Sequence, residues 1–304
     1  MPSFIASTLL LAAAVVQGVA AQNCSISFEG RVKQDFELAD FDSNVTSVWN
    51  PSFVLGRNTK WSQILAFPRK RTNTLFSTSP EFKSIEMTIN DGSLFQPNPA
   101  DNTSVQTGFR RSELIPVVFP VSGADSSSGV KTFHFSLKAN PARPLNFSHE
   151  YSLVFQEDSS YSTNQFVLKT GTIIGTNGTA GGKPMLLLQG NQNTAETLFA
   201  VPFDQRVWHN YGILQDFNAN TIRVYYSTGT APLKARTDAI PNDNSGGGEF
   251  HFGMLKKPTG TETDVTKSGF QSSGIDERLS YAGIFQENSE GGCISLGGEV
   301  PRSY

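Results

Sequence analysis

The 304-residue sequence has little cysteine, little histidine and little excess charge. It contains two Cys and four His, and 24 Lys and Arg nearly balance 27 Asp and Glu, for a formal net charge of −3. No basic block occurs along the chain, which argues against nucleic acid or an anionic membrane as the partner. A neutral polymer suits this charge balance better.

The sequence also lacks an apolar run long enough to cross a membrane. The longest such run, residues 5–16, is too short, and the small residues Val19, Ala20 and Ala21 that follow it form the exit that signal peptidase favours. We therefore predict a signal peptide over residues 1–21 and a secreted, extracellular protein that starts at Gln22. We expect a monomer.

The two cysteines stand near opposite ends of the predicted mature chain, Cys24 and Cys293. Because secreted thiols seldom stay unpaired, we predict a disulfide between them, against the alternatives of two free thiols or a bridge to a partner. In the chain-entropy account a loop of this length stabilises the fold by at most roughly 4 to 5 kcal/mol. The two ends of the chain should therefore lie side by side.

Sequons are frequent, whereas motifs for metals and cofactors are missing. Glycosylation is expected at some of the five Asn-X-Ser/Thr sites, which are Asn23, Asn44, Asn102, Asn146 and Asn177. No histidine pair has ligand spacing, and there is no EF-hand loop, phosphate-binding glycine loop or Gly-X-Ser-X-Gly elbow. We expect no cofactor and leave open a structural Ca²⁺ near Asp40 and Asp42.

Strand periodicity runs through the chain, and helical periodicity is nowhere sustained. Apolar and polar residues alternate over residues 131–138, 150–156, 165–169 and 221–226. With 27 Gly, 16 Pro and 23 Phe, the composition supplies frequent turns and bulky side chains for a space between two sheets. We predict an all-β, two-sheet jelly-roll or concanavalin-like sandwich, a single domain over residues 22–304.

The alternation assigns each side chain to a face. If Phe133, Tyr151, Phe155 and Phe166 point into the core, the polar residues between them share an outer face. These outward residues include His134, Glu150, Gln156, Gln165 and Lys169. Such a face is either solvated surface or the floor of a binding cleft.

Residues 109–114 add a further strand to this set, with Arg111 and Glu113 on one face. An Arg beside a Glu is usually a surface ion pair of little energetic weight. On a cleft floor the same pair keeps Glu113 ionised, because the neighbouring positive charge lowers its pKa.

Five short motifs in this order resemble glycoside hydrolase family 131. They are the segments 108–114 (GFRRSEL), 133–136 (FHFS), 146–151 (NFSHEY), 162–171 (STNQFVLKTG) and 208–210 (WHN). The resemblance spans most of the predicted mature chain. It implies a secreted fungal enzyme with a β-jelly-roll catalytic domain that hydrolyses β-1,3-, β-1,6- and β-1,4-linked glucans, with inversion.

Glycoside hydrolysis commonly needs two carboxyl groups, one protonated acid and one ionised base or nucleophile. We predict Glu113 and Glu150 as this pair, roughly 6.5 to 9.5 Å apart for an inverting enzyme. Glu150 is assigned as the acid and Glu113 as the base, with the reverse assignment left open. Glu157 is the alternative second carboxylate; a regular strand would turn it toward the core, and a bulge would undo that argument.

The remaining candidates are histidines and side chains along the outer face. The resemblance suggests a catalytic, proton-relaying role for His209. Arg111, His134, Gln165 and Lys169 are predicted to bind substrate, with His149 and Trp61 as weaker cleft candidates. His251 is assigned a structural role.

Two other functions fit the same fold. Jelly-roll polysaccharide lyases carry a similar Arg-Ser-Glu-Leu strand and a Lys-bearing strand, but the Gln-X-His that they need is absent where this sequence reads Gln156-Glu157-Asp158. A non-catalytic glycan-binding protein has no need of two carboxylates on one face.

Overall fold

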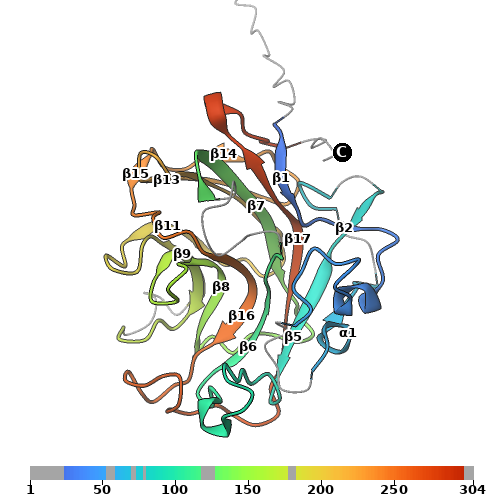
Figure 1. The fold of residues 1–304 in the computed structure, drawn as a ribbon, viewed down its shortest axis with the longest axis vertical. Helices are drawn as coiled ribbons and strands as arrows, with labels where there is room; N and C mark the ends of the chain where they lie inside the picture. The colour runs from blue at the N-terminus through green and yellow to red at the C-terminus, as the bar shows by residue number, and fades with distance from the viewer. Residues whose placement is uncertain are drawn as a thin grey trace, which may run out of the picture.

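The computed structural model describes residues 24–52, 59–69, 73–77, 80–117, 127–176 and 183–297. These residues form two antiparallel β-sheets that pack face to face, with little helix (Figure 1). This confirms the single-domain jelly-roll sandwich. The predicted signal peptide and the sequons at Asn23 and Asn177 lie outside the described residues.

The larger sheet has nine strands. Its main path is β14 (Lys234–Ala235), β13 (Thr221–Thr228), β12 (His209–Asp216), β7 (Val130–Ala139), β17 (Asp276–Asn288), β5 (Ile85–Asn90) and β3 (Leu65–Ala66). Two strands pair outside this path, β1 (Ile26–Glu29) with β17 and β15 (Ile240–Pro241) with β13.

The second sheet has six strands and carries the candidate site. Its order is β11 (Thr197–Pro202), β10 (Met185–Gln189), β9 (Asn164–Gly171), β8 (Glu150–Glu157), β16 (Glu249–Lys256) and β6 (Arg110–Leu114). Figure 1 shows β8, β9 and β16 on one side of the molecule and β7, β17 and β5 on the other.

Short elements complete the described chain. They are β2 (Val32–Lys33) paired with β4 (Phe82–Lys83), the α-helix α1 (Trp61–Ile64), and the 3₁₀ turns η1 (Leu38–Asp42), η2 (Asn102–Ser104) and η4 (Glu290–Gly292). None of the helices in the described part of the chain is long and apolar enough to cross a membrane.

The core is the layer of apolar side chains between the two sheets. Phe133 and Phe135 of β7 pack there, as the alternation predicts, with Phe250 and Phe252 of β16 facing them. The rings of Phe133 and Phe250 stack with centroids 4.1 Å apart. Each such buried side chain contributes roughly 1.5 to 3 kcal/mol to the free energy of folding.

The prediction that His134 shares a polar face with Glu150 is wrong. Its strand β7 belongs to the nine-stranded sheet, whereas β8 and β9 belong to the six-stranded sheet. The outer faces of the two sheets lie on opposite sides of the core. Alternation along a strand decides which side chains share a face, but it does not say which sheet the strand joins.

A bulge in β8 overturns the predicted facing of its second half. Ser152 pairs with Lys169 of β9 and Val154 pairs with Leu168, so β8 has one extra residue between these pairs. Leu153 and Val154 therefore both pack in the core. The alternation inverts beyond this point, so that Gln156 faces inward, contrary to expectation.

Phe155 and Glu157, predicted to face the core, consequently lie on the outer face. Phe155 stacks on the outward-facing ring of His251 at a centroid distance of 4.2 Å. Gln156 reaches the other sheet and accepts a hydrogen bond from Gln215 of β12 at 2.7 Å. The parity argument against Glu157 as a site residue thus fails.

The predicted disulfide joins Cys24 and Cys293, whose Cα atoms are 5.7 Å apart. Strand β1 follows Cys24 and pairs with β17, the last long strand before Cys293. The two ends of the described chain are therefore held together by a covalent bond and by a strand pair. This arrangement confirms the prediction that the two cysteines bring the ends of one sandwich domain side by side.

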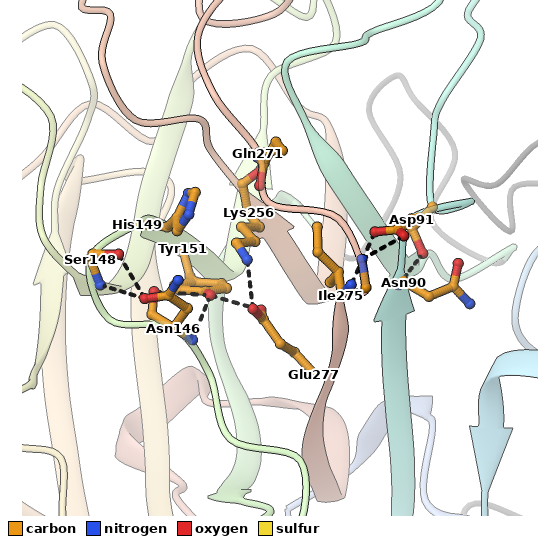
Figure 2. Close-up of polar contacts among 12 residues, drawn as sticks. Asn90, Asp91, Asn146, Ser148, His149, Tyr151, Lys256, Gln271, Ile275 and Glu277 are labelled. Carbon is orange, nitrogen blue, oxygen red and sulfur yellow. Dashed lines mark hydrogen bonds and ion pairs between the residues drawn. The ribbon is translucent and has the colours of Figure 1, made fainter.

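A buried ion pair connects the two sheets (Figure 2). Nζ of Lys256 on β16 donates to Oε1 of Glu277 on β17 at 2.5 Å, and the Tyr151 hydroxyl on β8 donates to Oε2 at 2.7 Å. Lys256 is fully buried and Glu277 is 6% exposed. Both carboxylate oxygens thus have donors, which offsets the cost of removing the charges from water.

Candidate active site

Charged side chains gather on the outer face of the six-stranded sheet, where β6, β16 and β8 run side by side. Arg111 and Glu113 come from β6, His251 from β16 and Glu157 from the end of β8. They face outward because their neighbours, such as Leu114 and Phe252, occupy the core.

Glu113 is a fully buried, ionised carboxylate. Arg111 donates to it through Nε at 3.0 Å and Nη2 at 2.7 Å, and Nδ1 of His251 lies 2.9 Å from Oε2. Burial alone would raise the pKa of Glu113, but the Arg111 charge and the His251 hydrogen bond outweigh it and lower the pKa to about 2. Its side chain is 0% exposed, so Glu113 does not meet solvent.

His251 stands between Glu113 and Glu157. A carboxylate can only accept, so Nδ1 carries the proton toward Glu113 and leaves Nε2 as the exchangeable nitrogen. Nε2 lies 3.5 Å from Oε2 of Glu157 and 4.0 Å from Oε2 of Glu249, and it has no hydrogen-bond partner among the described residues. Stacking on Phe155 fixes the plane of the ring.

Glu157 is the accessible carboxyl group of this cluster, with 25% of its side chain exposed. Burial of the remainder raises its pKa above the ordinary value of 4.5, and the nearby Glu113 and Glu249 charges raise it further. His251 and Arg111 act in the opposite direction and only partly offset this. Glu113 and Glu157 are therefore two carboxyl groups whose pKa values are pushed apart, as in acid–base catalysis.

The sequence between residues 26 and 292 matches the family model described as Glycoside hydrolase 131 catalytic N-terminal domain. This chain belongs to glycoside hydrolase family 131. The resemblance read from five short motifs is thereby confirmed, and glycoside hydrolysis follows as the general activity. No match was found among curated proteins.

Two solved structures of family 131 share the fold. The β-glucanase catalytic domain from Podospora anserina is 21% identical, with a TM-score of 0.67. The catalytic domain from Coprinopsis cinerea is 19% identical, with a TM-score of 0.63. Each comparison covers 90% of this chain and 98% of the other.

Glu150 of this family 131 chain lies on the same outer face as Glu157. It stands outside the cluster formed by Arg111, Glu113, His251 and Glu157. Its Oε1 is 2.7 Å from Nζ of Lys257 and 3.2 Å from Nζ of Lys169, and its Oε2 accepts the backbone N–H of Ile174 at 2.8 Å. Burial raises the pKa of Glu150, and the two lysine charges outweigh it and lower it. An ionised carboxylate enclosed in this way lacks the proton that a general acid must donate.

His209 and His134, two of the predicted histidines, lie apart from the cluster. His209 faces the interior, with Nδ1 hydrogen-bonded to the Tyr226 hydroxyl at 2.7 Å and Nε2 to the Asp204 carbonyl at 3.0 Å. His134 is fully buried on the nine-stranded sheet and pairs with Glu287 at 2.8 Å. The structure therefore does not bring either ring to Glu113.

The remaining predictions divide between the face and the interior. Arg111 and Lys169 lie on the outer face of the six-stranded sheet, in contact with Glu113 and Glu150. Gln165 is fully buried and donates to the carbonyls of Ser245 and Gly247, and Trp61 is buried, so neither offers an exposed surface.

His251 is the residue that sequence reasoning missed. Phe250 and Phe252 flank it, so the alternation rule applied to β7 would also have turned His251 outward. The rule could not place it next to Glu113, because β16 and β6 are separated by more than 130 residues and meet only through sheet pairing.

The structure does not test the possible Ca²⁺ near Asp40 and Asp42 or the predicted glycosylation sites. Asp40 accepts the N–H of Glu37 and Asp42 accepts the hydroxyl of Ser62. Three sequons, Asn44, Asn102 and Asn146, are exposed. Glycosylation at these positions stays a prediction.

Proposed function

We propose that this protein is a secreted, monomeric β-glucanase that cleaves β-1,3-, β-1,6- and β-1,4-linked glucans with inversion, using Glu157 as general acid. The observation that carries this proposal is the position of His251 between a buried, ionised Glu113 and an accessible Glu157. The description of the Podospora anserina relative as a β-glucanase supports the substrate class. The Cys24–Cys293 disulfide supports an exported protein.

Glu157 suits the acid role because it combines access with a raised pKa. A general acid must hold a proton at the working pH and reach the leaving oxygen of the glycosidic bond. Glu113 meets neither requirement, since it is buried and its pKa is about 2.

His251 suits the base role. The ionised Glu113 orients the ring and stabilises the imidazolium that forms when Nε2 takes a proton from the attacking water. Glu157 gives its proton to the leaving oxygen in the same reaction. The proton of Glu157 stays on the released sugar hydroxyl, and the 3.5 Å contact between Nε2 and Glu157 lets the proton taken from water pass to Glu157 and restore the acid.

Inversion is supported by what Glu113 is unable to do. Both of its oxygens are hydrogen-bonded and neither is exposed, so it does not attack the sugar to form a covalent intermediate.

Sugar release from laminarin, a β-1,6-glucan and a mixed-linkage glucan tests the proposal directly. We expect saturated products with reducing ends, and NMR of the first products should show the inverted anomer. Unsaturated products that absorb in the ultraviolet would identify a lyase, and binding without release would identify a glycan-binding protein.

The pH profile of kcat/KM should have an alkaline limb above pH 4.5, because activity is lost as the raised pKa of Glu157 is passed and its proton leaves. Glu249→Gln removes one of the negative charges that raise this pKa, so the limb should move to lower pH. A limb that stays in place or moves up in this variant would contradict the assignment of Glu157 as the acid.

Tyr161 is the candidate sugar platform. It is 59% exposed in the turn after Glu157, with a positive φ of 58° that a non-glycine residue seldom adopts. Its N–H bonds to the Asp158 carbonyl, and the neighbouring Ser159 N–H bonds to Gly246 of the loop before β16. The exposed ring therefore stands at the end of β8 and the start of β16, near Glu157.

Tyr161→Ala should lower kcat/KM on polymeric glucan by up to about tenfold, since a stacked ring contributes roughly 0.5 to 1.5 kcal/mol. Tyr161→Phe, which keeps the ring, should recover most of this loss. Equal losses in both variants would assign the effect to the hydroxyl instead.

A further inference from the structure

We propose that Lys169 and Lys257 form a subsite for the carboxylate of an acidic sugar unit, on the same sheet face as the catalytic cluster. The place of this subsite in a reaction depends on the proposed glycoside hydrolysis, whereas its ability to bind an anion does not. The chemistry recognised is a carboxylate carried by a β-linked glucose unit, either a uronic acid within the chain or an aldonic acid at its end.

The two ammonium groups converge on one oxygen. Nζ of Lys257 and Nζ of Lys169 lie 2.7 and 3.2 Å from Oε1 of Glu150. Oε2 of Glu150 is occupied by the Ile174 N–H, so this carboxylate is held in place from both sides. The lysines are thereby fixed close to each other, although Lys169 lies on β9 and Lys257 directly follows β16.

The cluster carries an excess positive charge. One carboxylate faces two ammonium groups, and the described residues contain no second acidic group in an ion pair with either lysine. One lysine would suffice to neutralise the buried Glu150. The second adds a partly desolvated charge, which is unfavourable unless another anion completes the arrangement.

Both lysines remain accessible to a ligand. Their side chains are 16% and 23% exposed, whereas the side chain of Glu150 is 2% exposed. Each ammonium group has three N–H donors, and Glu150 is the one ion-pair partner that the described residues provide for both. Donors therefore remain for a carboxylate that arrives from the open side.

Lys169 lies within the outer face of the six-stranded sheet rather than on an edge strand. Lys169 lies on β9, between Ser152 of β8 and Leu187 of β10. His251 pairs with Phe155, which pairs with Val167, two residues before Lys169. Two strand spacings and two residues of rise place Lys169 about 12 Å from His251, within reach of one oligosaccharide chain.

A binding experiment tests the subsite without requiring hydrolysis. Calorimetry at low salt should compare three β-1,4-linked glucotetraoses: the neutral alditol, the aldonic acid and a chain with one glucuronic acid unit. We expect at least about tenfold tighter binding of one acidic ligand than of the alditol, as a charge-assisted hydrogen bond implies. The ligand that gains identifies the source of the carboxylate.

Substitutions test whether the lysines cause the preference. Lys169→Met and Lys257→Met should each reduce the ratio of acid to alditol affinity toward one, and Lys257→Arg should keep it. Glu150→Gln should increase the ratio, because it removes the competing negative charge. Lys234→Met, at an exposed position on β14, is the matched control and should leave the ratio unchanged.

Equal affinity of the wild type for all three ligands would overturn the proposal, as would a preference that persists in both methionine variants with unchanged circular dichroism. Hydrolysis of neutral glucan without a preference for acidic ligands would support the proposed glucanase activity and contradict this subsite. Tighter binding of an acidic ligand without any hydrolysis would support the subsite and contradict the proposed glucanase activity.

Discussion

Glu157→Gln should lower kcat on polymeric β-glucan by about 10³-fold, within the range that general acid catalysis contributes. The amide keeps the size of the side chain but has no acidic proton for the leaving oxygen. Reducing-sugar release at the wild-type pH optimum measures the loss, with the unfolding temperature recorded to show that the variant is folded.

An activated substrate separates the acid role from other roles. An aryl β-glucoside with a good leaving group needs little protonation, so Glu157→Gln should lose far less activity on it than on glucan. Replacement of His251 by Gln, which removes the base, should instead impair both substrates. If the aryl substrate is not spared in Glu157→Gln, Glu157 is not the acid.

Three further glutamate variants complete the design. Glu150→Gln should lose much less glucanase activity than Glu157→Gln, and the opposite order would restore the pair Glu113 and Glu150. Glu262→Gln, in an exposed loop, is the matched control and should retain wild-type activity. Glu113→Gln should act through His251, so its pH profile should change together with kcat.

Lys256→Met should destabilise the protein by about 3 to 5 kcal/mol, because it leaves the Glu277 carboxylate buried without its cation. For a chain of this size the expected fall in unfolding temperature is on the order of 10 °C. Thermal unfolding followed by circular dichroism measures it.

A surface ion pair near the same strand provides the control. Arg143 and Asp276 interact at 2.9 Å, but their side chains are 39% and 54% exposed. Arg143→Met should therefore cost less than about 1 kcal/mol. The double variant Lys256→Met with Glu277→Gln should recover part of the loss, since no uncompensated charge remains; a loss below about 1 kcal/mol for Lys256→Met alone would contradict the argument.

Local pattern predicted much of the fold correctly. Alternation identified β7, β8 and β9 as strands and turned Arg111 and Glu113 of β6 to a common face. The pairing of Cys24 with Cys293 also followed from the sequence, because two cysteines in a chain predicted to be exported have few other choices. These inferences succeeded because strand period depends on residues close together in the chain, and two cysteines allow one pairing within it.

The composition of the candidate site depended on longer-range events. One extra residue in β8 turned Glu157 outward, and nothing in its apolar and polar pattern marks where that bulge occurs. The same strand carries Glu150 on the same face, so the choice between the two required knowing which neighbours each one meets.

The sequence by itself determined the strand content, the sandwich, the disulfide and the ordered motifs that indicate family 131. Only the tertiary structure decided that β7 and β8 belong to different sheets, that His251 meets Glu113, and that two lysines enclose Glu150. The physical reason is that periodicity is a property of each strand alone, whereas ion pairs and shifted pKa values arise between strands that are distant in sequence and adjacent in the sheet.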